Sequence, residues 1–355
     1  MNPAQFLTQF DRISDAASAI PRLRRFNFDL AVRGKLVEQD PRDEPASELL
    51  KRIQVVKLRL EKEGKIRKQQ SLLQLGPDEM PFDIPVKWEW THLGEIGLTQ
   101  TGTTPSKNYG DHFGSHIPFI KPGDLYPNNV DYTNEGLSET GLKESGRIAP
   151  GGSLLMVCIG TIGKCQLIDR DCSFNQQINS LSPYGNLSSR YLMAACLSEY
   201  FQKAAWAASA RTTIAILNKG KWELLLLPLP PLAEQNRIVA KVDELMALCD
   251  RLEASQAEQE NRRDRLAAAS LHRLNNGEDP DAFRNHARFY FNHLPRLTTR
   301  TEHIQHIRQT ILNLAVHGHS SCKIPMMNPL HSCSRESGQK KISWLHGTRL
   351  DALGV

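Results

Sequence analysis

The chain has 355 residues, a net charge of +5 and a sequence pI near 8.8, so it is long enough for a sizeable core and two structural regions. No apolar run approaches membrane-spanning length, and the start at Met1 lacks the basic and apolar blocks of a signal peptide, so we expect a cytoplasmic protein. The seven cysteines form no Cys-x-x-Cys pair, which argues against a disulfide framework and a zinc site and favours core positions for Cys158, Cys165 and Cys172.

Residues 1–79 are expected to form a helical region, with a loop punctuated by Pro41 and Pro45. After this loop, apolar residues recur at steps of three and four, which predicts a helix, capped by Ser47 or a neighbour, whose apolar face packs on another helix. These residues are Ala46, Leu49, Ile53, Val56 and Leu60. Basic side chains on the helix could form a solvated face or follow DNA phosphates. They are Lys51, Arg52, Lys57, Arg59, Lys62, Lys65, Arg67 and Lys68.

From Met80 the composition changes to Gly, Pro, Thr and Asn with short apolar runs. This punctuation predicts a compact mixed domain of short strands, turns and ordered loops over residues 80–231. Within it, residues 117–125 are expected to be an extended segment and a turn, and residues 152–160 a buried strand. Residues 188–210, rich in Ala and Leu, are expected to be its main helix.

The domain ends in a proline-rich run over residues 224–232, because prolines end a strand and stiffen its exit. A long helix then begins near Ala233, and its apolar positions again step by four and three before the pattern becomes polar at Gln256 and Gln259, ahead of Leu266. This favours a long, partly solvent-bridging antiparallel helix pair over packing within a single globule. The apolar positions are Ile238, Val242, Leu245, Cys249 and Leu252.

One segment of twelve residues occurs twice in the chain, in similar form. Residues 23–34 read Leu-Arg-Arg-Phe-Asn-Phe-Asp-Leu-Ala-Val-Arg-Gly, and residues 307–318 read Ile-Arg-Gln-Thr-Ile-Leu-Asn-Leu-Ala-Val-His-Gly. Such self-similarity indicates a duplicated structural unit. We therefore expect residues 232–318 to contain the long helix and the start of a second unit.

The second copy does not continue as the first does. Residues 323–329 can be encoded so that the frame one base earlier spells Gln-Asp-Pro-Asp-Asp-Glu-Pro, which nearly repeats residues 39–45 of the first copy. We therefore predict that residues 319–355 are an out-of-frame tail, disordered or irregular, with a native divergent tail as the alternative. Resequencing that finds no continuation of the repeat in any nearby reading frame would contradict this prediction.

Motifs for catalysis are weak. The run from Gly160 to Cys165 resembles a phosphate loop, but Cys158 stands where the first glycine should be and Cys165 replaces the hydroxyl that would hold magnesium. The sequence contains neither a Gly-x-Gly-x-x-Gly after a strand nor the Asn-Pro-Pro-aromatic tetrad of amino-methyltransferases, so we expect no S-adenosylmethionine in this chain. No nucleophile, metal cluster or paired carboxylate stands out, which favours a binding role over catalysis.

Several motifs, taken in their order and spacing over residues 20–318, resemble the specificity subunit of type I restriction-modification enzymes. They are residues 30–37 with 40–47, residues 102–106 followed by 117–125, residues 160–164 with 174–179, and residues 229–239. The resemblance implies an α+β fold, in which one mixed α/β target recognition domain is flanked by long helices that form an antiparallel coiled-coil-like arm.

In that family, two target recognition domains each read half of a split DNA sequence, and helical regions set their separation and dock two methyltransferase subunits. The resemblance implies a non-catalytic subunit that binds double-stranded DNA, type I methyltransferase subunits and, where present, a restriction subunit. S-adenosylmethionine is then expected in the partner methyltransferase. Because this chain holds one recognition domain, a homodimer through the helical seams would restore two and read a palindromic split site. The alternative is an inactive truncated scaffold that binds the methyltransferase subunit without functional DNA recognition.

Base readout requires amide, hydroxyl and cationic side chains on ordered loops, with separate Lys or Arg contacts to phosphates. Five loops fit by composition. The candidate DNA-binding residues are Thr103, Thr104, Ser106, Lys107, Asn108 and Tyr109; Lys121; Thr161 and Lys164; Asn175, Gln176 and Gln177; and Arg211, Thr212, Thr213, Asn218 and Lys219. Glycines, prolines and Asp124 in these loops are better explained as turn formers.

Overall fold

The computed structural model describes residues 19–66, 76, 80–106, 108, 110–145, 147–211, 214–276 and 279–316. The predicted tail over residues 319–355 and the basic residues Arg67 and Lys68 lie outside this part of the chain. The chain divides into two compact units between Glu258 and Gln259. The boundaries of the four segments expected from the sequence remain predictions.

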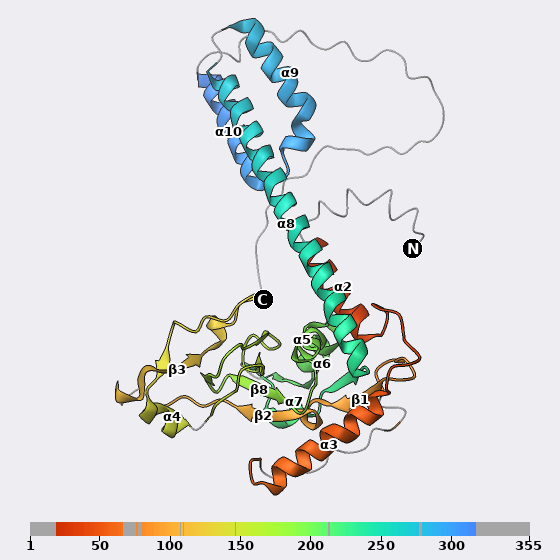
Figure 1. Cartoon of the computed structure of the whole chain (residues 1–355). Coiled ribbons are helices and arrows are strands. Elements are labelled where there is room, and N and C mark those ends of the chain that lie inside the picture. Colours follow the sequence, from red (N-terminus) through yellow and green to blue (C-terminus); the bar gives the residue numbers. More distant parts are fainter. Residues whose placement is uncertain are drawn as a thin grey trace, which may run out of the picture. The chain divides into compact units, whose positions relative to one another are not determined.

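Helices and strands are both well represented, which confirms the predicted α+β class (Figure 1). The helices are α2 (Ala19–Val32), α3 (Ala46–Lys62), α4 (Glu139–Ser145), α5 (Ser189–Leu197), α6 (Glu199–Ala208), α7 (Lys219–Glu223), α8 (Leu232–Asn275), α9 (Pro280–Leu297) and α10 (Thr301–Val316). Short 3-10 helices are η2 (Leu93–Glu95), η3 (Gly110–His112) and η4 (Pro122–Asp124). The strands are β1 (Glu89–His92), β2 (Gly97–Thr101), β3 (Phe113–Ile120), β4 (Gly136–Leu137), β5 (Leu154–Val157), β6 (Cys165–Leu167), β7 (Ser173–Phe174), β8 (Ile178–Pro183), β9 (Ala210–Arg211), β10 (Ala215–Ile216) and β11 (Leu226–Leu229).

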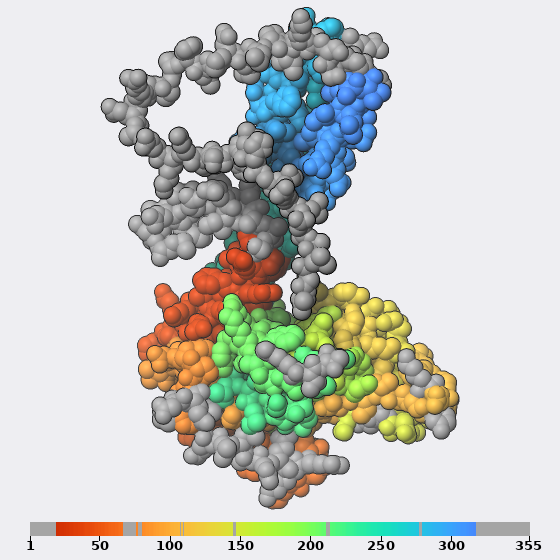
Figure 2. Space-filling view, turned by 180° about the vertical axis from the view of Figure 1, so that it is seen from behind, coloured from red at the N-terminus to blue at the C-terminus, as the bar shows by residue number. Residues whose placement is uncertain are grey.

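The first unit is built around small sheets. The largest is antiparallel, with the order β2-β8-β5-β6. β3 pairs antiparallel with β4 and parallel with β7, and Figures 1 and 2 show this region and α2 on opposite sides of α5 and α6. β1 pairs antiparallel with β11, so the first and last strands of the central domain close it.

Two local predictions for the central domain have different outcomes. β5 is buried at every position, which confirms the buried strand expected within residues 152–160. The single main helix expected over residues 188–210 is wrong, because it is broken at Ser198 between α5 and α6. The hydroxyl oxygen of Ser198 accepts a hydrogen bond from the N–H of Phe201 at 3.2 Å and thus starts a new helix.

The apolar face of α3 packs into the mixed core of the first unit. Ala46, Leu49 and Ile53 are buried in the same cluster as residues from the strands, α5 and α8. The cluster contains residues of strands as well as helices, so this face belongs to a mixed core and not to a seam with one partner helix alone. Ser47 is not the cap either, because the helix begins at Ala46, whose N–H donates to the carbonyl of Lys87.

Lys57 is also placed differently from the solvated or phosphate-facing position expected of it. Its side chain is buried, and its ammonium lies 2.8 Å from the Glu95 carboxylate. Lys57 is thus a structural cation that fixes α3 on the central domain.

α2 runs antiparallel to the part of α8 that belongs to the first unit (Figure 1). Arg24 pairs with Asp250 at 2.6 Å and with Glu253 at 2.8 Å, and Asn27, about one turn further along α2, donates its Nδ2 to the sulfur of Cys249, which is earlier in α8. This confirms the predicted antiparallel helix pair and shows that α2 supplies its first helix. Of the predicted α8 positions, Ile238, Val242 and Cys249 are buried and Leu245 and Leu252 are partly buried.

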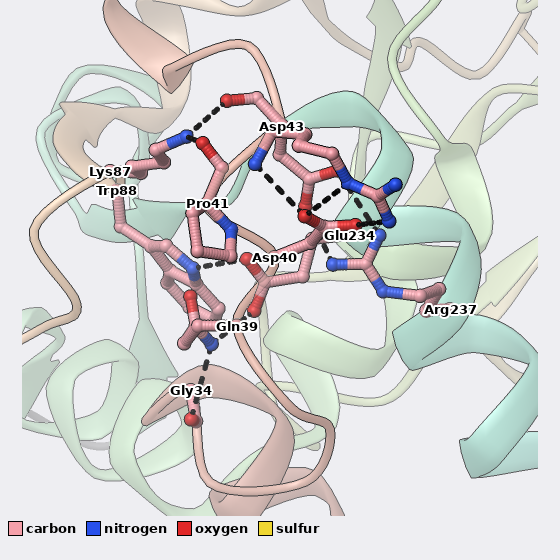
Figure 3. A network of polar contacts seen from close by, with 10 residues as sticks. Gly34, Gln39, Asp40, Pro41, Asp43, Lys87, Trp88, Glu234 and Arg237 are labelled. Atoms are coloured by element: carbon pink, nitrogen blue, oxygen red, sulfur yellow. Dashed lines mark hydrogen bonds and ion pairs between the residues drawn. The ribbon is translucent and has the colours of Figure 1, made fainter.

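A polar network ties the loop between α2 and α3 to the start of α8 (Figure 3). The carboxylate of Glu234 is almost fully buried and accepts hydrogen bonds from Gln39 Nε2 at 2.6 Å and Trp88 Nε1 at 2.9 Å. Burial raises the pKa of Glu234, and these two hydrogen bonds oppose that shift. One turn later in α8, Arg237 pairs with Asp43 at 2.6 Å.

Gln235, which follows Glu234 in the motif over residues 229–239, joins α8 to the central domain. Gln235 is fully buried; its Oε1 accepts from the N–H of Ser188 at 3.1 Å, and its Nε2 donates to the carbonyl of Pro230 at 2.9 Å. Together with Glu234, it explains why an acidic residue and an amide follow the proline-rich exit of the domain.

The second unit contains the last part of α8 with α9 and α10. Its core cluster consists of Ala267, Leu271, Leu274, Tyr290 and Leu297. The predicted seam position Leu266 is instead 47% exposed, because the residue that follows it faces the neighbouring helices.

Residues 23–32 of the first copy lie in α2 and residues 307–316 of the second copy lie in α10, so both copies are helical over these residues. Their surroundings differ. Ala31 and Val32 of the first copy are fully buried, whereas the matching Ala315 is exposed and Val316 is 83% exposed.

Candidate nucleic-acid interface

The predicted loop over residues 103–109 lies next to the predicted loop over residues 175–177. In the order of the chain these are the first and the fourth of the five predicted loops. Thr103 donates its N–H to the carbonyl of Phe174 at 3.1 Å, and the hydroxyl of Thr104 donates to Gln176 Oε1. A Cβ added at Gly102 would overlap the carbonyl oxygen of Phe174, so the close approach of these loops requires glycine.

Asn175 connects the fourth loop to the second. Its N–H donates to the carbonyl of Ile120 at 3.0 Å, and its Oδ1 accepts from the N–H of Gln177 at 3.1 Å. Asn175 is buried and serves as a turn former, whereas Gln177 is partly exposed and Gln176 is exposed. The fold therefore uses Asn175 to present the amide of Gln176 at the surface.

The lysines predicted in the second and third loops have partners within the fold. Lys121 forms an ion pair with Glu135. Lys164 donates to the carbonyl of Pro122 at 2.6 Å, and its ammonium lies 6.0 Å from the centre of the Tyr126 ring. These contacts join the two loops and leave both lysines partly exposed.

The third loop, which contains Thr161 and Lys164, also contacts the fourth loop at Gln177 and the fifth loop at Ala215 and Leu217. Gly160 donates its N–H to the carbonyl of Ala215 at 3.0 Å, and the carbonyl of Cys158 accepts from the N–H of Leu217 at 2.8 Å. The N–H of Cys158 in turn donates to the carbonyl of Gln177 at 2.8 Å. Burial raises the pKa of Cys158 to about 12, so this thiol stays protonated near neutral pH and belongs to the core.

In the fifth loop, Asn218 caps α7, since its Oδ1 accepts from the N–H of Lys221 at 2.9 Å. Lys219 pairs with Glu223 at 2.8 Å. Lys107, Tyr109, Thr212, Thr213 and the side chain of Arg211 lie outside the described residues.

We call residues 102–108, 120–125, 158–164, 174–178 and 214–219 the recognition loops. Backbone hydrogen bonds connect all five into one cluster. Their described and exposed polar side chains are those of Thr104, Ser106, Asn108, Thr161, Gln176 and Asn218. Amide and hydroxyl groups held on rigid loops are the groups that can hydrogen-bond base edges in a DNA groove.

Two apolar side chains of the cluster were missed by the reasoning from sequence. Ile214 is 56% exposed and Ile216 is 41% exposed, although they flank the well-anchored Ala215. Exposed apolar groups among polar ones can contact thymine methyl groups. The short apolar run Ile-Ala-Ile-Leu between polar residues is the signal that the sequence offers.

Within the described residues, no group of three or more His, Cys, Asp or Glu side chains is placed to hold a metal ion. None of the helices described has the length and apolar character needed to cross a membrane.

Comparisons with known proteins agree with the motifs. The model of the type I restriction modification DNA specificity domain matches residues 85–260. The EcoAI specificity subunit of Escherichia coli is 33% identical over 268 residues, which are 71% of this chain and 44% of the relative. The EcoEI specificity subunit of Escherichia coli is 30% identical over 341 residues, which are 91% of this chain and 55% of the relative. The chain thus spans about half the length of the curated relatives it matches.

Among solved structures, the HsdS subunit from Thermoanaerobacter tengcongensis is similar to this chain with a TM-score of 0.41 and 19% identity, over 67% of this chain and 50% of that chain.

Proposed function

The chain belongs to the family of type I restriction-modification specificity subunits, and we propose that it is the DNA-reading subunit of such an enzyme. It directs adenine methyltransferase subunits, and a restriction subunit where one is present, to a bipartite DNA site in the cytoplasm, without catalysis of its own. One observation carries the proposal: the recognition loops, which hold the described candidate residues, are joined by backbone hydrogen bonds into one cluster inside the segment that the family model matches.

Gln176 is the strongest candidate for base readout. Its amide is exposed, and the hydroxyl of Thr104 donates to one lone pair of its Oε1. The second lone pair and the Nε2 hydrogens remain for a base edge. A glutamine amide presented in this way matches the acceptor N7 and the donor N6 of adenine in the major groove.

The helical regions are the proposed docking sites for methyltransferase subunits, and α10 also supports a homodimer. The apolar residues Ile311 and Leu312 on α10 are each 60% exposed, as is most of Val316, whereas the first copy of the segment buries Ala31 and Val32. A second copy of the chain would cover this surface and would bring a second recognition domain to the complex. Sedimentation of the purified chain should then give the mass of a dimer, and a monomer at micromolar concentration would contradict this part of the proposal.

The alternative is an inactive scaffold that binds the methyltransferase subunit without functional DNA recognition. The observation in its favour is that the chain spans about half the length of its matched relatives. Co-expression with a partner methyltransferase, followed by mapping of methylated adenines, separates the two. A palindromic split motif that depends on this gene supports the proposed function, whereas methylation identical with and without the gene supports the scaffold.

A further inference from the structure

A cationic hollow of about 460 Å³ lies along β2, one of the two edge strands of the largest sheet. We call it the β2 hollow. Its lining residues are Lys65, Ile66, Leu98–Thr101, Arg147 and Lys219. All belong to the first unit, and Figure 1 shows β2 in the centre of the domain, close to α7, which begins at Lys219.

The charge of the β2 hollow is of one sign. Lys65, Arg147 and Lys219 are basic, and none of the described residues that line the hollow is acidic. Arg147 is exposed and makes no ion pair within the described part of the chain. A polar concavity with several cations is a site for an anion.

The two lysines can turn toward an anion at little cost. Lys65 pairs with Glu63 and Lys219 with Glu223, each at 2.8 Å. The two lysines are 67% and 37% exposed, so water reaches both ion pairs and each contributes little to stability. Glu223 would keep a partner if Lys219 moved, because the hydroxyl of Thr99 also donates to its carboxylate. The lysine charges are thus available to a ligand without leaving a buried carboxylate unpaired.

The strand that forms the floor of the hollow also places Arg147. Gln100, near the end of β2, donates its Nε2 to the carbonyl of Ile148 at 2.9 Å, which fixes the backbone next to Arg147. Thr101, at the end of the same strand, donates its hydroxyl to Asn179 Oδ1 at 2.8 Å and leads directly into the first recognition loop. The hollow therefore adjoins the recognition loops at two points, through Thr101 and through Lys219.

We infer that the β2 hollow binds the phosphate backbone of the DNA duplex whose bases the recognition loops read, with Arg147 as its main contact and Lys65 and Lys219 beside it. The inference rests on the proposed function. Its chemistry differs from base readout, because a phosphate contact fixes the position of the duplex and carries no sequence information. Neutralising a phosphate also releases condensed counterions, so each contact steepens the salt dependence of binding.

The test uses the full chain in complex with its partner methyltransferase and measures duplex binding by fluorescence anisotropy across a salt series. Arg147→Gln should make the negative slope of log K against log salt shallower by about 0.9, on cognate and mixed-sequence duplexes alike. The methylated motif should stay unchanged. Arg147→Lys should keep the wild-type slope, because the charge is retained. Lys143→Gln is the matched control, since it removes one exposed charge from α4 outside the hollow and should also keep the slope.

The outcomes separate the inference from the proposed function. If the wild-type complex binds no duplex at low salt, both fail. If the wild type binds and Arg147→Gln keeps its slope, or if the substitution alters the methylated motif, only the β2 hollow loses its role. Circular dichroism of Arg147→Gln should match the wild type, because the side chain is exposed.

Discussion

Glu234 is the residue whose removal should most weaken the junction between the N-terminal loop, the central domain and α8 (Figure 3). Glu234→Ala removes the acceptor of Trp88 Nε1, and the Trp88 ring is only 3% exposed, so no water replaces the lost partner. A buried donor left unpaired costs about 1 to 3 kcal/mol, and a hydrogen bond to a charged group contributes about 1.5 to 3 kcal/mol. The amide of Gln39 is exposed and regains water, and the burial cost that raises the pKa of Glu234 disappears. We therefore expect a net loss of about 2 to 4 kcal/mol in the free energy of unfolding.

The assay is urea unfolding followed by circular dichroism, on Glu234→Ala, Trp88→Phe and the double variant. Trp88→Phe removes the indole donor and keeps an aromatic ring in the core. If the two groups interact as described, the double variant should be less destabilised than the sum of the single variants by about 0.5 to 3 kcal/mol. A Glu234→Ala variant within 0.5 kcal/mol of the wild type, or strictly additive effects, would refute this reasoning.

Three further predictions address the loops and the pH dependence. Gly102→Ala should lower the free energy of unfolding by about 1 to 3 kcal/mol, because its Cβ meets backbone oxygens, whereas Gly110→Ala, with open space around it, should stay within about 0.5 kcal/mol of the wild type; equal effects in denaturant would contradict the loop packing. Because the folded-state pKa of Glu234 is raised above 4.5, its contribution to stability increases as the pH falls from neutrality toward 4.5, so the wild type should gain stability relative to Glu234→Gln over that range, and a constant difference would count against the buried carboxylate. Gln176→Ala should relax the methylated motif at one base pair, with about 1 to 3 kcal/mol less discrimination in competition binding, and an unchanged motif would remove Gln176 from the readout.

Some features of the fold were visible in the sequence because they depend on local pattern. The all-apolar run of β5 and the long periodic segment of α8 specify a buried strand and a helix before any tertiary contact forms. The core residue Lys57 and the break at Ser198 were not predicted. A buried cation depends on a distant carboxylate, here Glu95, and a single serine in an alanine-rich run gives little local sign that it ends one helix and starts another.

In the candidate site, too, features that depend on local composition were predicted, and features that depend on distant residues were not. Composition selected the five loops, since amide, hydroxyl and glycine residues are concentrated there, and the structure brings the described parts of these loops together. Composition did not reveal that Lys121 pairs with Glu135 or that Lys164 donates to Pro122, because those partners come from other segments. It also did not single out Arg147, whose position depends on a hydrogen bond from Gln100 to the neighbouring residue.

Hydrogen–deuterium exchange of the complex with its methyltransferase, recorded with and without a duplex that carries the methylated motif, shows whether the recognition loops contact DNA. If the recognition loops read the bases, the duplex should slow exchange in residues 102–108, 120–125, 158–164, 174–178 and 214–219. Protection by the duplex that leaves these segments unchanged and falls on α9 or α4 instead would contradict base readout by these loops.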